Sequence, residues 1–262
     1  MLAQLPIDGK AYELENLFKS KNWGCQQKMD GHRYLIDVKS RKSYNRKGEE
    51  KHHPINLEVL ASLGNWILDG ELVGNKYYVF DGIHGDDRQD PFNLRYFALK
   101  QDIAELNSPL VNIVPLVTEE EEKRKLYDFV KTNKGEGVVF RLLDSLYQSG
   151  KSHHVYKYKF YKDVDCFIGD TDEDKANVSL YMYRGDRKVE VAKCSTLTGD
   201  GPSLKPDDVV KVKFLYVSKE GRLYQPTLPK IRTDKTKEEC TIDQLDSFKT
   251  DKQLFYEPAP LS

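Results

Sequence analysis

The sequence lacks several features that would assign it to a particular class of protein. No run within its 262 residues approaches the roughly 18 consecutive apolar residues that a membrane-spanning helix needs. The first residues lack the basic stretch followed by an apolar stretch that marks a secretory signal. Glycine and proline, at 17 and 11 residues, are too few for collagen or a low-complexity chain. We therefore expect a globular protein that is not bound to a membrane.

Cysteine and excess charge are also scarce. The four cysteines, at positions 25, 166, 194 and 240, lie far apart and form no C-x-x-C pair, so we expect neither a disulfide framework nor a zinc site. Isolated thiols suit a reducing compartment, which predicts a cytoplasmic protein. The 41 Lys+Arg against 42 Asp+Glu give a net charge of -1. Composition alone leaves the function open.

Local charge is less even than the total. Residues 28–51 and 151–162 are rich in lysine and arginine, whereas residues 163–174 carry acidic side chains and no base. Such a change of sign favours a boundary between two units, although a solvated charged face would look similar. We therefore expect one domain over residues 1–162 and a second over residues 163–262.

The hydrophobic patterns predict an α+β first domain and an all-β second domain. In the first, a hairpin over 66–73 and 76–83 turns at Gly74–Asn75, and Asp90–Pro91 opens a helix through about residue 106. Thr118 and Glu121 form a capping-box pattern before another helix. Further strands are expected at 34–38, 137–141 and 155–161, and in the second domain at 178–183, 188–194, 208–217 and 223–226. The second series predicts a five-stranded barrel.

Two motifs resemble known binding sites but lack the spacing or the orientation that binding requires. Gly150-Lys151-Ser152 ends like a phosphate-binding loop, but Ser145 stands where that motif needs glycine. The adjacent pairs His52-His53 and His153-His154 would point to opposite faces of a strand, so neither pair chelates a metal easily.

A set of charged residues carries more chemistry. Asp69 and Glu71 lie two residues apart and so on one face of a strand, and Lys157 and Lys159 share a face in the same way. Each signal alone has an ordinary structural explanation. Together the lysines, arginines and acids predict a cleft for a triphosphate and a divalent metal held by carboxylate oxygens. A lysine amine among other cations can also serve as a nucleophile, and Lys28 is the candidate.

The same residues resemble, in order, the motifs of the covalent nucleotidyltransferases, the superfamily of ATP-dependent DNA ligases and messenger-RNA capping enzymes. The resemblance covers positions 28 to 235. Its segments are K-M-D-G-H-R at 28–33, N-R-K-G at 45–48 (with Asn45 where ligases have serine), L-D-G-E-L at 68–72, Y-V-F-D-G at 78–82, P-x-x-x-R at 91–95, E-G-V-V at 136–139, K-Y-K at 157–159 and I-R-T-D-K at 231–235.

The resemblance implies a nucleotidyltransferase (adenylation) domain of antiparallel sheets with flanking helices, followed by an OB-fold β-barrel. It also implies a mechanism. Lys28 would attack the α-phosphate of ATP to form lysyl-AMP, with Mg²⁺, or Mn²⁺ in its place, as the metal. AMP would then pass to the 5′-phosphate of a nick, and the 3′-hydroxyl would displace it. The catalytic residues would be Lys28, Lys157 and Lys159; the nucleotide-binding residues Gln27, Arg33, Arg46, Glu71, Phe80, Glu136, Lys157, Lys159, Arg232 and Lys235; the metal ligands Glu71 and Glu136; and the DNA or pyrophosphate contacts Arg33, Arg46, Arg232, Asp234 and Lys235.

Several features bear on which member of the superfamily this is. Glu136 and the Arg46-Lys47-Gly48 element are typical of DNA ligases, whereas Gln26 replaces the glutamate that ligases commonly carry two residues before the nucleophile. Tyr158 between the paired lysines is reminiscent of capping enzymes. We expect an ATP-dependent DNA ligase acting on nicked duplex DNA as a monomer. The alternatives are a capping guanylyltransferase, an RNA ligase, and a non-catalytic nucleic-acid-binding module.

The motif positions also suggest a small enzyme. Only 27 residues precede Lys28, so the resemblance implies a minimal two-domain ligase of the phage, viral or bacterial type. The loop over 195–208 is short, and we expect no large DNA-encircling latch there. Because a small ligase must bind DNA yet release the sealed product, and phosphate contacts weaken steeply with salt, DNA binding should be modest and strongly salt-sensitive.

Overall fold

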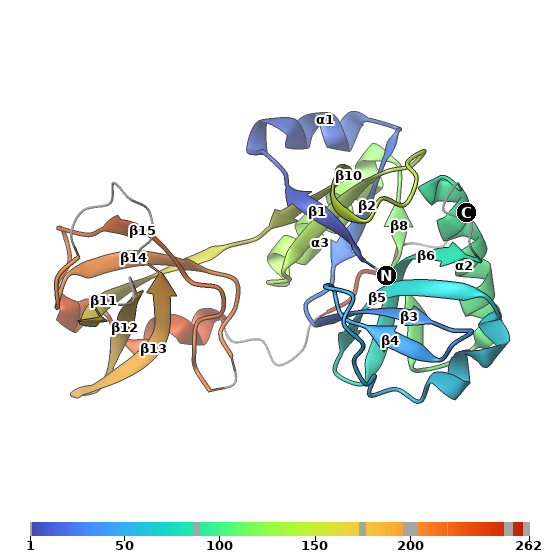
Figure 1. Cartoon of the computed structure of the whole chain (residues 1–262). Helices are drawn as coiled ribbons and strands as arrows, with labels where there is room; N and C mark the ends of the chain where they lie inside the picture. The colour runs from blue at the N-terminus through green and yellow to red at the C-terminus, as the bar shows by residue number, and fades with distance from the viewer. Residues whose placement is uncertain are drawn as a thin grey trace. The chain divides into compact units, whose positions relative to one another are not determined.

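The chain folds into two compact units (Figure 1). The computed structural model describes residues 2–85, 90–172, 177–195, 204–218, 220–248 and 254–258. The first unit comprises residues 1–158 and 253–262, and the second comprises residues 159–252. These limits differ from the predicted domains 1–162 and 163–262, mainly because residues 254–258 return to the first unit. Most of the loop expected to lack a latch lies outside the described residues.

The first unit contains two five-stranded sheets. One has the strand order β1-β10-β9-β2-β8, with bounds Gln4–Asp8, Gly150–Lys159, Gly137–Leu142, Trp23–Lys28 and Leu116–Val117. Strand β1 runs parallel to β10, while β2 is antiparallel to both β9 and β8. Helix α1 (Leu14–Lys19), which follows the short 3₁₀ helix η1 (Ala11–Glu13), and helix α3 (Glu120–Thr132) cover this sheet through buried side chains that include Phe18, Leu126 and Val130. Strand β2 therefore lies inside the sheet, in a rigid setting.

The second sheet of this unit has the order β4-β3-β5-β6-β7, with bounds Lys42–Tyr44, His32–Asp37, Trp66–Val73, Lys76–His84 and Val111–Ile113. The predicted hairpin is confirmed: Val73 pairs with Lys76, and Gly74 takes the positive φ of 61° that the tight turn requires. Helix α2 (Phe92–Leu106) and the 3₁₀ helix η2 (Leu57–Leu63) pack their apolar residues into one core with this sheet.

The second unit is built on one antiparallel sheet in the order β13-β12-β11-β14-β15, with bounds Arg187–Ser195, Asn177–Arg184, Lys162–Asp172, Val209–Phe214 and Thr227–Ile231. Two 3₁₀ helices, η3 (Lys237–Glu239) and η4 (Ile242–Phe248), follow. The inward residues of these strands form a separate apolar core that includes Ile168, Leu180 and Val212. Five short strands around one core agree with the expected OB-type architecture; no ladder joins the two edge strands among the described residues.

Two predicted local features are wrong. Helix α3 begins with Glu119 as its N-cap and has no side-chain capping bond, so the pattern of Thr118 and Glu121 forms no capping box. The strand expected at 223–226 does not form, because Gln225 adopts a positive φ of 49° and breaks the extended chain. Strand β15 begins only at Thr227.

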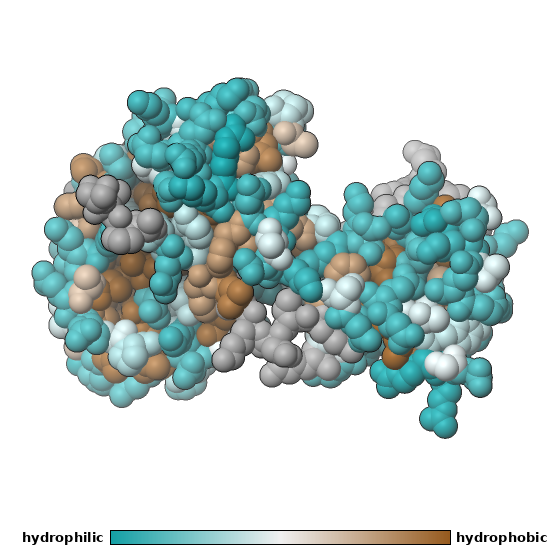
Figure 2. Space-filling view, turned by 180° about the vertical axis from the view of Figure 1, so that it is seen from behind, coloured by the Kyte–Doolittle hydropathy of each residue, from teal (hydrophilic) through white to brown (hydrophobic). Residues whose placement is uncertain are grey.

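The surface and the thiols fit the composition. Figure 2 shows a mostly hydrophilic face interrupted by hydrophobic patches. All four cysteines are buried and none is joined in a disulfide, as predicted. Among the described residues, no helix has the length and apolar character needed to cross a membrane.

Candidate active site

The predicted nucleophile stands at the end of a central strand. Lys28 closes β2 and faces Gly137 of β9 in antiparallel register. Glu136 immediately precedes β9, and its Oε2 accepts a hydrogen bond from Lys28 Nζ at 2.6 Å. The Glu136 side chain is only 6% exposed, against 21% for Lys28. The fold thus joins two predicted site residues that are 108 positions apart in the sequence.

Close packing explains why the nucleophile motif has glycine at position 31. The chain leaves β2 through Asp30 and Gly31 to enter β3. A Cβ on Gly31 would lie 2.1 Å from the carbonyl oxygen of Leu72, which is too close for any other residue. This close approach holds β3 against β5, where Arg33 pairs with Glu71.

Glu71 supplies a second carboxyl group beside Lys28. Burial away from water raises the pKa of Glu71 to about 7; Lys28 and Arg33 lower it, and the carboxylates of Glu136 and Asp69 raise it further. The positive charges of Lys28 and Arg33 therefore compensate the buried carboxylate only in part. A divalent cation between Glu71 and Glu136 would provide the remaining charge, and Mg²⁺ is commonly held by one or two carboxylates plus substrate phosphates. No cluster of three or more metal-binding side chains occurs among the described residues, so the ligand would supply the remaining oxygens.

Arg33 is held by a buried partner instead of facing open solvent. Its Nε and Nη2 donate to the two oxygens of Asp69 at 2.8 and 2.6 Å, and Nη2 also donates to the carbonyl oxygen of Gln4. Asp69 is 2% exposed and accepts a further bond from the Tyr147 hydroxyl. Asp69 and Glu71, predicted to share one face, therefore have different surroundings: Asp69 anchors Arg33, and Glu71 lines the cavity beside Lys28.

Phe80, the predicted adenine-stacking residue, lies close to two guanidinium groups. Arg33 and Arg141 are 5.1 and 5.0 Å from its ring centroid. Arg141 was not predicted. It is 7% exposed, donates to Gln26 Oε1 at 2.8 Å, and lies 3.5 Å from Asp81. The one sequence feature that could have indicated Arg141 is its charge at the end of the otherwise apolar segment G-V-V-F-R. The side-chain amide of Gln26 also donates to the backbone carbonyl oxygens of residues 80 and 114, and so ties the strand that carries Phe80 to β2.

These side chains enclose a cavity of about 60 Å³ at the end of β2. Typical small-molecule pockets measure roughly 300–1,000 Å³, so a whole nucleotide would require neighbouring side chains to move apart. The residues that line it are Pro6, Gln26, Gln27, Lys28, Met29, Arg33, Glu71, Phe80, Val139 and Arg141.

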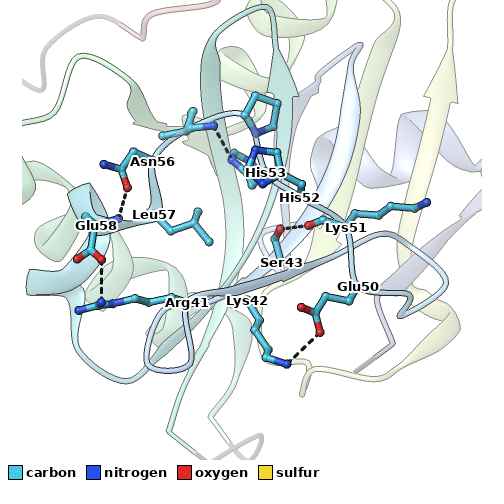
Figure 3. Close-up of a pocket in the computed structure, with 12 residues that line it drawn as sticks. Arg41, Lys42, Ser43, Glu50, Lys51, His52, His53, Asn56, Leu57 and Glu58 are labelled. Carbon is cyan, nitrogen blue, oxygen red and sulfur yellow. Dashed lines mark hydrogen bonds and ion pairs between the residues drawn. The ribbon is translucent and has the colours of Figure 1, made fainter.

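A larger cavity of about 660 Å³ lies elsewhere, over residues 41–43 and 50–58 (Figure 3). Four of its charged side chains form ion pairs, Arg41 with Glu58 and Lys42 with Glu50. His53 on its wall has a pKa lowered to about 4 by burial and sits between aromatic rings. Size alone is a poor guide here, because the predicted nucleophile Lys28 lines the smaller cavity.

The paired lysines do not line the small cavity as the structure describes it. Lys157 lies in the part of β10 that pairs with β1, and its Nζ is 3.4 Å from Asp8 Oδ1. Lys159 ends β10 as the first residue of the second unit, where it donates to Gln225 Oε1 at 2.9 Å. Their predicted contact with the α-phosphate stays a prediction.

Arg46 lies exposed in a tight loop after β4. Asn45 shapes this loop: its Oδ1 accepts bonds from the backbone N–H groups of residues 47 and 49, and Gly48 takes a positive φ of 82°. Asparagine in place of the ligase serine therefore serves the turn through its side-chain oxygen. The loop leaves Arg46 available to a phosphate on the surface.

The predicted pyrophosphate contacts form a cluster within the second unit. Arg232 binds both oxygens of Asp234 at 2.7 and 2.6 Å. Arg232 and Lys235 also donate to the two oxygens of Asp165, at 3.1 and 2.6 Å. Asp165 was not predicted as a site residue, because nothing in the sequence around it indicates that it will lie beside Arg232 and Lys235. The paired arginine keeps the pKa of Asp234 well below its usual range.

Gln27 lines the cavity, but its carboxamide faces another part of the chain. Its Nε2 donates to the carbonyl oxygen of Leu254 at 2.8 Å, and its Oε1 accepts from the backbone N–H of Tyr256 at 2.9 Å. Gln27, which was predicted to bind the nucleotide, is thus hydrogen-bonded to residues 254–256 instead.

The two units together have the architecture of the catalytic core of DNA ligases. Among solved structures, a Lig E DNA ligase described as binding DNA with a minimal scaffold superimposes with a TM-score of 0.67 at 16% identity, over 88% of this chain and 99% of that one. The ligase domain of LigD from M. tuberculosis gives 0.54 at 18% identity, over 92% and 98%. Pmar-Lig_PreS3 gives 0.69 at 14%, over 88% and 68%.

At these identities the likeness shows the fold, which is the one that the sequence motifs predicted. No protein-family model matches the sequence, and no curated protein does either.

Proposed function

We propose that this protein is an ATP-dependent DNA ligase that seals nicks between a 5′-phosphate and a 3′-hydroxyl in duplex DNA. One observation carries the proposal: Lys28 and Glu136 meet at 2.6 Å beside Glu71, at the end of a central strand. The three residues come from three separate motifs. A non-catalytic binding module has no need for this arrangement, whereas a covalent nucleotidyltransferase requires a lysine among acids and cations.

The proposed first step uses the chain's own groups. The Lys28 ammonium first gives up a proton to solvent water, which leaves its ion-pair partner Glu136 ionised and able to hold the metal. The neutral amine then attacks the α-phosphorus of ATP, the bond to the β-phosphate breaks, and pyrophosphate leaves. Phe80 offers a ring for the adenine, while Glu71 and Glu136 would hold Mg²⁺, which neutralises phosphate charge when bound. Such chemistry depends mainly on positioning and charge neutralisation.

The later steps involve the polymer. AMP passes from Lys28 to the 5′-phosphate at the nick, and the 3′-hydroxyl displaces it to form the phosphodiester. Arg46, exposed on its loop, is suited to a DNA phosphate. Arg232 and Lys235 would reach the leaving pyrophosphate when they exchange Asp165 for it. We further propose that the protein works as a monomer in the cytoplasm, a location supported by its four buried thiols.

Labelled nucleotide tests the proposal. Purified protein with magnesium and α-labelled ATP should acquire a covalent, acid-labile label, and Lys28→Ala should lose it. Nicked DNA carrying a 5′-phosphate should then be sealed. Label from GTP alone would indicate a capping enzyme, sealing of RNA but not DNA an RNA ligase, and absence of any label a binding module.

A further inference from the structure

Residues 254–258, hereafter the returning segment, dock on the first unit after the chain has built the second. Their central contact is the carboxamide of Gln27. This side chain donates to the carbonyl oxygen of Leu254 and accepts from the N–H of Tyr256, much as a neighbouring strand would. Gln27 is 5% exposed, so its end of both bonds is buried, while the segment's end is partly exposed.

Two aromatic side chains anchor the returning segment. The Phe255 ring stacks on Tyr78 of β6 with centroids 4.4 Å apart and an interplanar angle of 18°. The Tyr256 ring packs edge-on against Phe129 of α3 at 5.5 Å, and its hydroxyl donates to Glu122 Oε2 at 2.9 Å. The segment therefore joins three elements: β2, β6 and α3.

Two of those three elements form the candidate nucleotide pocket. Gln27 lines the cavity and precedes the nucleophile directly. Tyr78 lies two residues before Phe80 in β6, and both belong to one apolar cluster with Met29 and Val114. The returning segment itself does not line the cavity. Among the described residues, its contacts reach the pocket only through Gln27 and Tyr78.

We propose that the returning segment is a positioning element that holds Gln27 and Tyr78, and through them the Lys28 strand and the Phe80 wall, in place while the neighbouring side chains move apart to admit ATP. This inference rests on the proposed ligase function. It assigns Phe255 and Tyr256 a role in nucleotide affinity without direct contact with the nucleotide. Loss of the anchors should therefore raise the KM for ATP in self-adenylation more than it lowers kcat.

Single substitutions in the full chain test this proposal. Phe255→Ala removes the stack, and Tyr256→Ala removes the edge contact and the bond to Glu122. Each should raise the KM for ATP about tenfold, as expected for the loss of one well-packed contact, with kcat within about twofold. Phe255→Trp should restore the wild-type value. Leu254→Ala is the matched control, because its side chain is 51% exposed and its carbonyl group is kept.

Hydrogen exchange of the free protein provides a readout independent of activity. Phe255→Ala should speed exchange in residues 23–28 and 76–84, and Leu254→Ala should not. An unchanged KM in both alanine variants of a protein that labels with ATP would overturn the proposal alone. A parallel fall of kcat and melting temperature without a KM effect would also overturn it, as a purely structural role. A wild-type protein that takes no label would overturn the ligase function, and the proposal with it.

Discussion

Glu71 offers the sharpest test of the electrostatics of the site. Its burial, opposed by Lys28 and Arg33, raises its pKa from the ordinary 4.5 to about 7. The folded protein therefore keeps a proton on Glu71 at pH values where the unfolded chain has released it. At about 1.4 kcal/mol per pH unit, this difference gives an upper bound of about 3 kcal/mol for the cost of ionising Glu71 in the free protein. Glu71→Gln removes that cost.

The sign follows from proton linkage. Between pH 4.5 and about 7 the native state binds more protons than the unfolded state, so this group lowers stability as the pH rises. The penalty is absent below pH 4.5 and complete above about 7. The free energy of unfolding of Glu71→Gln, minus that of the wild type, should accordingly increase from pH 5 to pH 8 by up to about 3 kcal/mol.

Tryptophan fluorescence during urea unfolding provides the measurement. The two tryptophans, Trp23 and Trp66, both lie in the first unit, so their signal follows the unit that contains Glu71. The experiment is done without metal or nucleotide, and Glu105→Gln, on the exposed side of α2, is the control. A difference that stays flat or shrinks with rising pH would refute the reasoning. Added Mg²⁺ and ATP should reverse the advantage of the variant, because they favour the ionised carboxylate.

Three further outcomes follow from the contacts described. Asp69→Ala leaves the Arg33 guanidinium buried without its partner and should cost about 3–5 kcal/mol in urea unfolding; a loss below about 1 kcal/mol would show that water reaches the site. Asp165→Asn weakens the competing hold on Arg232 and Lys235, so self-adenylation should quicken several-fold while sealing of a pre-adenylated nick stays unchanged; equal changes in both assays would contradict a role confined to pyrophosphate. DNA affinity should fall at least about tenfold between 50 and 200 mM salt in a fluorescence-anisotropy titration, and a flat salt dependence would exclude phosphate-dominated binding.

Local sequence signals predicted the elements that local physics controls. The turn at Gly74 and the alternating residues around it were sufficient for the hairpin, and Asp90–Pro91 was sufficient to locate the start of α2. Strand β2 was not predicted from its pattern, because its two glutamines hide an element whose residues are almost all buried. Its place in the fold was indicated only by the motif that ends in Lys28.

Pairings between distant residues were beyond such signals. Arg141 meets Gln26 across 115 residues, and Asp165 meets Arg232 across 67. Nothing near either residue indicates which strand will lie opposite. The return of residues 254–258 to the first unit was missed for the same reason: the charge reversal near residue 162 marks where the chain leaves that unit, and no comparable signal marks where it comes back.

Most of the lysines and arginines that the motifs predict to bind phosphate form ion pairs with carboxylates in this structure. How deeply each ion pair is buried indicates which of these cations can exchange its carboxylate for a phosphate. The Asp8 side chain is 78% exposed, so its pair with Lys157 contributes at most about 1 kcal/mol, and an arriving phosphate can displace it readily. The pair of Arg33 with Asp69 is nearly inaccessible to water, and breaking it costs several times more.

Lys28 lies between these extremes, because it is partly exposed while Glu136 is buried. Under the proposed function, a nucleotide would draw Lys157 and Lys28 away from their partners, while Arg33 would stay with Asp69 and act on the ligand through the pocket wall that it forms with Phe80. On this reasoning Arg33 contributes to ATP binding by shaping the pocket, and Arg33→Lys should lower the stability of the free protein as well as its affinity for ATP.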